Sequence, residues 1–179
     1  MTEEEIINQG RDLVTFYEWL KDEKEFKIGD KIDKHNVCTA YIKRPDVEDK
    51  KCKNLTLFAY SNPTNIKKCI VSRFELVTDI NVDRRLINIE NIHGSHTEIK
   101  LINYIFANEL IKENSELAFF SLIKECKCCR DSIEIAELVY KTGFPKLKDF
   151  RMFMISETSF GELWEIDKNG NVIRTYDIN

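Results

Sequence analysis

The chain has 179 residues, of which 42% are apolar and 32% charged, and its formal net charge is −4. This length and apolar content fit one folded domain with its own core, and no apolar run reaches the roughly 20 residues that a membrane-spanning helix needs. The acidic N-terminus MTEEEII lacks the basic flank and apolar stretch of a signal peptide. We therefore expect a cytoplasmic protein with no membrane partner.

The N-terminal half of the sequence predicts one helix followed by strands. Apolar residues recur at helical spacing over 3–23, which predicts an amphipathic helix. Runs rich in β-branched and aromatic residues predict strands at 37–42, 54–60, 69–78 and 86–92. Because glycine and aspartate interrupt the pattern near position 30, we expect residues 1–35 to form an N-terminal helical extension and residues 36–179 the main domain.

The C-terminal half predicts alternating helices and strands. The apolar run at 116–123 is nearly continuous, which is typical of a strand buried on both faces. The order of strand, helix, strand, helix and strand predicts an α/β fold with a mixed sheet. The other predicted elements are a helix at 96–113, a helix at 130–141, a strand at 151–156, and a tail hairpin at 162–177 closed by Asn169-Gly170.

Two short motifs stand at equivalent places in this pattern. His96-Thr97-Glu98 opens one predicted helix, and the CKCC run at 126–129 follows the buried strand and precedes the next helix. Three of the six cysteines crowd into that run, which suits metal binding or redox chemistry better than a disulfide framework. Because helix starts in α/β proteins line the carboxyl edge of the sheet, we expect the two motifs to converge in space.

The donor atoms of these motifs suit one zinc ion. His96, Cys126 and Cys129 offer an imidazole and two thiolates, which gives zinc three protein ligands and leaves a fourth position for water. Bound zinc lowers the pKa of water to about 7. Glu98, two residues after His96, is then a candidate proton shuttle between the water and a substrate.

The combination of H-x-E at 96–98 with C-x-x-C at 126–129 resembles the zinc-dependent cytidine-deaminase-like superfamily. The resemblance implies a three-layer α/β/α sandwich with a mixed central sheet of about five strands. Arg130, directly after the second cysteine, is similar to free-cytidine deaminases, and HTEIKLINYI is similar to bacterial toxin-type deaminases. Glu125 stands where the family usually has proline.

The resemblance implies zinc-dependent hydrolysis of cytosine to uracil, with single-stranded DNA as the favoured substrate and an immunity protein as a partner. It also implies delivery as an effector into a target cell as the alternative to a cytoplasmic location. The lack of a predicted helix after 151–156 resembles the cytosine-specific branch. Three basic clusters are candidates for a local basic groove, with ordinary solvated charges as the alternative: Lys67-Lys68, Arg84-Arg85, and Lys146 with Lys148 and Arg151. Free cytidine, a nucleotide or adenine remain alternative substrates, and a non-catalytic zinc module with Cys128 as fourth ligand is the alternative outside enzymes.

Several of these residues have structural alternatives. Ser95 and Glu98 match the S-x-x-E capping box, in which the glutamate satisfies backbone donors at a helix start. His93 is a candidate substrate contact or a solvated loop histidine. Phe58 and Tyr60, on a predicted strand, either stack on a nucleobase or pack in the core.

Overall fold

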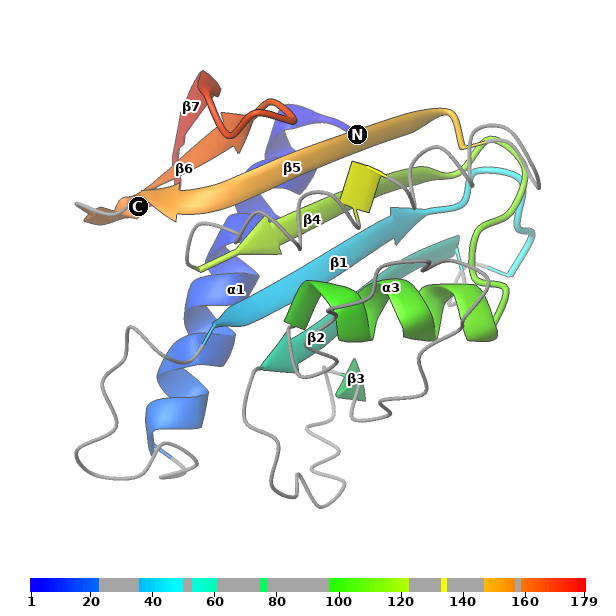
Figure 1. Ribbon diagram of the computed structural model, residues 1–179, viewed down its shortest axis with the longest axis horizontal. Coiled ribbons are helices and arrows are strands. Elements are labelled where there is room, and N and C mark those ends of the chain that lie inside the picture. Colours follow the sequence, from blue (N-terminus) through cyan, green and yellow to red (C-terminus); the bar gives the residue numbers. More distant parts are fainter. Residues whose placement is uncertain are drawn as a thin grey trace.

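The fold is seen in a computed structural model of the chain, in which one sheet carries a helix on each face (Figure 1). The structure describes residues 1–22, 36–49, 53–60, 75–76, 97–122, 133–134, 147–156 and 159–179. The elements are α1 (Glu3–Asp22), β1 (Val37–Lys43), β2 (Asn54–Tyr60), β3 (Glu75–Leu76), α3 (Thr97–Ala107), β4 (Glu116–Ser121), β5 (Asp149–Ser156), β6 (Ser159–Ile166) and β7 (Val172–Asp177).

The sheet is mixed, as predicted, and its strands follow the order β3-β2-β1-β4-β5-β6-β7. β1 pairs antiparallel with both β2 and β4, while β4 and β5 are parallel. β6 pairs antiparallel with β5 and β7. The expected count of about five strands is too low, because both strands of the tail hairpin join the same sheet and the two-residue β3 extends its other edge.

The predicted strands agree with the structure wherever it describes them. β1, β2, β4 and β5 lie within one or two residues of the predicted ranges. Of the strand predicted at 69–78, only β3 falls within the described residues, and the strand predicted at 86–92 lies outside them. Of the helix predicted at 130–141, the described pair 133–134 is helical and the rest lies outside.

Side chains alternate between two hydrophobic clusters along each central strand. On β1, Cys38, Ala40 and Ile42 join the cluster under α3, whereas Val37 and Tyr41 join the cluster under α1. This alternation follows from the two-residue repeat of a strand. Because helices cover both faces of the sheet, all six residues of β4 are buried, which explains the continuous apolar run in the sequence.

Helix α1 begins with a capping box. The Thr2 hydroxyl accepts a hydrogen bond from the Glu5 N–H at 3.2 Å, and the Thr2 N–H donates to the Glu5 carboxylate at 2.7 Å. The buried residues of α1 recur every three or four positions and pack on the same cluster as β1, β4, β5 and β6. The division at residues 35/36 stays a prediction, because residues 23–35 lie outside the described residues.

Helix α3 ends at Ala107, six residues before the predicted end at 113. The Leu110 N–H bonds to the Ile105 carbonyl at 3.0 Å, and the Glu109 N–H bonds to the Phe106 carbonyl at 3.1 Å. Glu109 has a φ of 50°. These two bonds and the left-handed residue form a Schellman motif, which ends a helix and usually has glycine at this position.

The tail hairpin predicted at 162–177 is confirmed by the pairing of β6 with β7. Residues 167–171 connect the strands, with Gly170 at a φ of 82°. The Asp167 carboxylate accepts hydrogen bonds from the N–H groups of Asn169 and Asn171, both at 2.8 Å. The Asn171 side-chain amide also donates to this carboxylate at 3.0 Å. This bond, followed by the backbone bonds, lowers the pKa of Asp167 because each favours the ionised carboxylate.

Only two residues separate β5 from β6, so the chain passes between these strands without a helix. In the described part of the chain, no helix combines the length and the apolar character that crossing a membrane requires.

Candidate functional site

Glu98 lies in the first turn of α3 and is 2% exposed. Figure 1 shows that α3 starts at the end of the sheet where β1 begins and β4 ends. A carboxylate in the first turn interacts favourably with the helix dipole, but burial of its charge also requires hydrogen-bond donors. The surroundings of Glu98 supply these donors from three separate segments.

Three neutral donors surround the Glu98 carboxylate. The Asn36 side-chain amide donates to Oε1 at 2.6 Å, and the Ser121 hydroxyl lies 3.4 Å from the same oxygen. The Thr97 hydroxyl donates to Oε2 at 2.9 Å. Asn36 directly precedes β1 and Ser121 ends β4, so residues far apart in the sequence meet at one carboxylate.

The structure therefore places the start of α3 beside the carboxyl end of β4. Ser121 precedes Cys126 by five positions, and Glu98 follows His96 by two. His93, His96, Cys126, Cys128 and Cys129 themselves lie outside the described residues. Within the described ranges, no group of three histidine, cysteine or acidic side chains could hold a metal ion.

The chemistry of the sequence motifs decides which metal would fit. One imidazole nitrogen and two thiolate sulfurs are ligands that zinc prefers, and three of them leave a position open. The described groups around Glu98 are hydroxyls and an amide. These groups suit holding a carboxylate, so the cluster fits a site in which Glu98 stands beside a metal and does not bind it.

Phe58 and Tyr60 are 0% and 1% exposed and belong to the cluster under α1. Phe58 packs against Phe16 of α1 with ring centroids 4.8 Å apart. These positions favour core packing over contact with a nucleobase. The Tyr60 backbone carbonyl, in contrast, accepts a hydrogen bond from Lys100 Nζ at 2.8 Å.

Sequence reasoning missed Asn36, Ser121 and Lys100. Lys100 is 4% exposed, and burial lowers its pKa because the ammonium is removed from water. Its spacing in α3 gives no signal of burial. For Ser121 a signal does exist, since a hydroxyl at the last position of a strand buried on both faces needs a polar partner.

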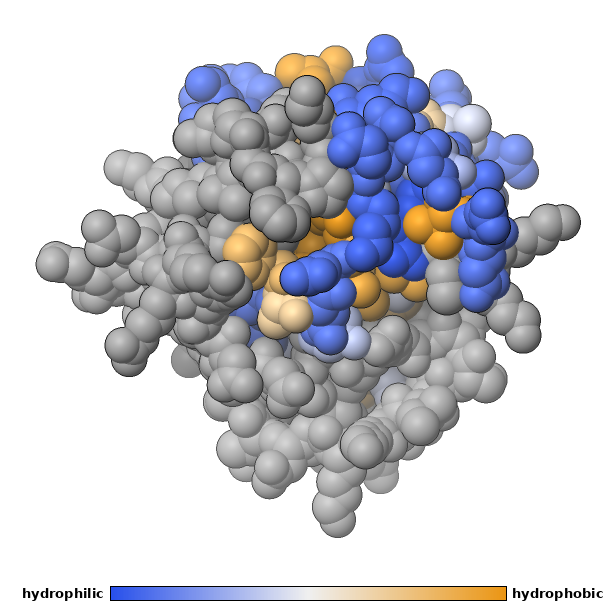
Figure 2. All heavy atoms as spheres, turned by 90° about the vertical axis from the view of Figure 1, so that its right-hand side faces the viewer, coloured by the Kyte–Doolittle hydropathy of each residue, from blue (hydrophilic) through white to orange (hydrophobic). Residues whose placement is uncertain are grey.

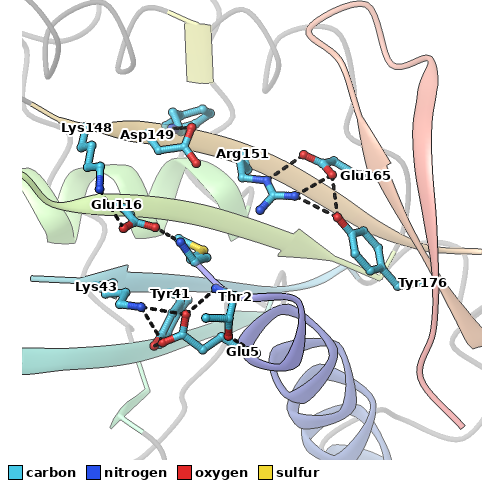
Figure 3. A network of polar contacts seen from close by, with 12 residues as sticks. Thr2, Glu5, Tyr41, Lys43, Glu116, Lys148, Asp149, Arg151, Glu165 and Tyr176 are labelled. Atoms are coloured by element: carbon cyan, nitrogen blue, oxygen red, sulfur yellow. Dashed lines mark hydrogen bonds and ion pairs between the residues drawn. The ribbon is translucent and has the colours of Figure 1, made fainter.

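A second polar cluster lies on the α1 face of the sheet, toward the end where β1 finishes and β4 starts (Figure 3). Lys43 binds Glu5 at 2.9 Å, and Glu116 binds the N-terminal amino group. Arg151 binds both oxygens of Glu165 at 2.7 Å. The predicted role of Arg151 in a basic groove is therefore not supported, because its guanidinium is occupied by a carboxylate.

Two cavities in the described part of the surface lie away from Glu98. Cavities of about 280 Å³ and 490 Å³ share Phe150, Arg151, Glu165 and Ile173 in their linings. Figure 2 shows the end of the molecule on the right of Figure 1, where hydrophilic residues form most of the described surface and apolar ones show between them. Neither cavity contains a residue of the Glu98 cluster.

Comparison of the chain with protein-family models, with curated proteins and with solved structures found no match.

Proposed function

We propose that the protein is a zinc-dependent hydrolytic deaminase that converts cytosine to uracil, with single-stranded DNA as its first candidate substrate. The observation that carries this proposal is the position of Glu98. Its carboxylate is buried in the first turn of α3, two residues after His96, and lies 3.4 Å from the hydroxyl of Ser121, five residues before Cys126. A deaminase needs this proximity, because the glutamate must act beside a metal held from both segments.

The order of the elements gives further support. A helix on each face of a mixed sheet is compatible with the sandwich that the H-x-E and C-x-x-C motifs imply. The direct hairpin from β5 to β6 resembles the branch of the superfamily without a helix at that point. That branch acts on cytosine in free cytidine deaminases and in many bacterial toxins, so cytosine is the proposed base and adenine the alternative.

In the proposed mechanism, His96, Cys126 and Cys129 would hold a zinc ion, which would supply Lewis-acid activation of water when bound. Glu98 accepts a proton from the attacking water and delivers it to a ring nitrogen of the base. The water oxygen bonds to C4, and the proton that remains on this oxygen passes through Glu98 to the amino group. The C4–N4 bond then breaks, ammonia leaves, and C4 becomes a carbonyl. One water is consumed, one ammonia is released, and the Glu98 carboxylate returns to its starting form.

The choice of a nucleic acid as substrate rests on the toxin-like sequence HTEIKLINYI at the start of α3. The net charge of −4 does not favour tight binding to duplex DNA by counterion release. Single-stranded DNA avoids the few kcal/mol that base extrusion from a duplex costs. An immunity protein would be the protein partner if the chain is a toxin module.

Deamination assays test the proposal. Zinc-loaded wild type and Glu98→Gln are incubated with single-stranded DNA, duplex DNA, RNA, cytidine and adenosine, and uracil, inosine and ammonia are measured. We expect uracil from the wild type and at least a 100-fold lower rate from Glu98→Gln, since proton transfer contributes roughly 100- to 10,000-fold. Glu113→Gln, which removes an exposed carboxylate, is the matched control and should keep full activity.

Two results would contradict the proposal. One is a zinc-loaded wild type that releases no product from any of the five substrates. The other is X-ray absorption showing four protein ligands around the zinc, with Cys128 as the fourth, because a closed shell is typical of a structural site. Removal of zinc by a chelator should abolish the activity, and added zinc should restore it.

A further inference from the structure

The proposed mechanism does not use Asn36, although it makes the shortest contact with Glu98. Its Nδ2 atom lies 2.6 Å from Glu98 Oε1, 2.8 Å from Ser121 Oγ and 3.2 Å from Thr97 Oγ1. We infer that Asn36 is a positioning residue that fixes the Glu98 carboxylate through its oxygen Oε1. The catalytic meaning of this inference rests on the proposed function, whereas the hydrogen bonds do not.

The amide of Asn36 directs its nitrogen toward Glu98. The opposite orientation would place the amide oxygen 2.6 Å from a carboxylate oxygen, and two acceptors at that distance repel each other. In the orientation seen, the Asn36 Oδ1 atom faces the Ser121 hydroxyl, which can donate to it at 3.2 Å.

Counting hydrogens shows that the two oxygens of Glu98 are held differently. Nδ2 carries two hydrogens, and its two shortest contacts are Glu98 Oε1 and Ser121 Oγ. Thr97 is then free to donate its own hydroxyl hydrogen to Oε2 at 2.9 Å. Oε1 is thus held by a planar amide with a second partner, and Oε2 by a hydroxyl that can rotate.

This difference makes Asn36 the group that anchors the carboxylate. The amide cannot turn without losing its bonds to Glu98 and to Ser121 together. The Thr97 hydroxyl, in contrast, can rotate away from Oε2 without displacing another group. Oε1 is therefore the oxygen whose position Asn36 fixes.

A first measurement tests the hydrogen bond without any need for activity. In ¹⁵N-labelled protein, the side-chain NH₂ protons of Asn36 are compared between wild type and Glu98→Ala. We expect one Asn36 proton to lie downfield in the wild type and to move upfield in the variant, while the amide of Asn103 is unchanged. An Asn36 signal that is the same in both proteins overturns the inference.

A second measurement tests the catalytic role with Asn36→Ala, Asn36→Asp and the control Asn103→Ala. Asn103 is 2% exposed on the same helix as Glu98, so its removal matches the loss of a buried amide. For Asn36→Ala we expect kcat to fall on the order of 10- to 100-fold with KM nearly unchanged, as for other outer-shell partners. Asn103→Ala should keep its kcat within about threefold of the wild type, because variants away from the reacting groups act mainly on stability.

The Asn36→Asp variant is tested by the pH dependence of kcat, which would not change if Asn36 only stabilised the fold. It keeps the shape of the side chain but places a second carboxylate against Glu98, and two carboxylates this close cannot both be ionised. The acidic limb of the kcat profile should therefore move to higher pH by about one unit or more. The profile of Asn36→Asp overturns the inference if it coincides with that of the wild type.

The outcomes separate the two proposals. If the wild type deaminates and Asn36→Ala loses no more activity than Asn103→Ala, the inference is wrong and the proposed function stands. If the wild type deaminates none of the substrates, the proposed function and the catalytic role of Asn36 are both wrong. The NMR measurement still shows whether Asn36 donates a hydrogen bond to Glu98. Should Asn36→Ala fail to fold in thermal unfolding, the equally sized Asn36→Asp variant carries the test.

Discussion

Replacing Glu165 by glutamine removes the central acceptor of the charge network on the α1 face. Glu165 is 8% exposed and accepts hydrogen bonds from Arg151 Nε and Nη2, both at 2.7 Å, and from the Tyr176 hydroxyl at 2.9 Å. A glutamine offers one oxygen, so its amide nitrogen would face a donor of Arg151 at one of these positions. Because a hydrogen bond to a charged group contributes about 1.5–3 kcal/mol, we expect the variant to lose about 2 kcal/mol of unfolding free energy at pH 7.

The loss should depend on pH with a definite sign. Burial alone would raise the pKa of Glu165, but the hydrogen bonds from Arg151 and Tyr176 outweigh it and lower the pKa below its ordinary value of 4.5. A group with a lowered folded-state pKa contributes stability above its unfolded pKa and loses it as the pH falls through the folded value. The difference between wild type and Glu165→Gln should therefore be full at pH 7 and shrink below about pH 4.5.

Urea unfolding at pH 7, 5 and 4 measures this difference directly. A loss of about 2 kcal/mol corresponds to a fall in Tm of about 4–8 °C for a domain of this size. Glu162→Gln, on the same strand but exposed, removes the same charge outside the network and should stay within about 0.5 kcal/mol of the wild type. Equal losses at pH 7 and pH 4, or a Glu165→Gln variant as stable as the control, would refute the reasoning.

Two backbone positions give further predictions. Gly10→Ala should lower Tm, because the new Cβ would meet Leu163 Cδ2 at 3.1 Å and Ile178 Cγ2 at 3.2 Å, both on buried side chains. Overpacking of this kind costs about 1–3 kcal/mol. This cost exceeds the gain in helix propensity, which is at most about 1 kcal/mol. A higher Tm for this variant would show that the α1–β6 contact is looser than described. Glu109→Gly should raise the unfolding free energy by about 0.5–1 kcal/mol, since glycine adopts the φ of 50° without strain. Glu109→Ala is its control, and an equal gain from alanine in urea unfolding would exclude the left-handed backbone as the cause.

The elements with strong periodicity were predictable from the sequence. Helix α1 buries a face with helical apolar spacing, and strands β1, β2, β4 and β5 stand out as short apolar and aromatic runs. The tail hairpin has its glycine at the turn. The end of α3 was not predictable in the same way. Its apolar residues continue past Ala107, because Leu110 and Ile111 pack on the cluster under α3 after the helix has stopped. Glu109 takes the position that glycine normally marks.

The partners of Glu98 could not be predicted, because they come from distant parts of the chain. Asn36 and Ser121 are separated from Glu98 by 62 and 23 positions, and nothing local in the sequence links them to it. Glu98 itself could be identified from the sequence, because the H-x-E and C-x-x-C motifs are defined by the spacing of reactive residues along the chain. The sequence could therefore nominate the carboxylate as a site residue, whereas only the fold shows the groups that hold it.

The buried acids of the described residues differ in a way that bears on the proposed chemistry. Glu165 is bound to Arg151, and Glu116 to the N-terminal amino group and, at 3.9 Å, to Lys148. Protonation of either acid would leave a cation without its partner, which is costly when the pair is buried. The partners of Glu98 in the described residues are instead an amide and two hydroxyls, all neutral. Among these three acids, Glu98 is therefore the one that the described residues bind without an ion pair, and this difference singles it out as the candidate for the proposed chemistry.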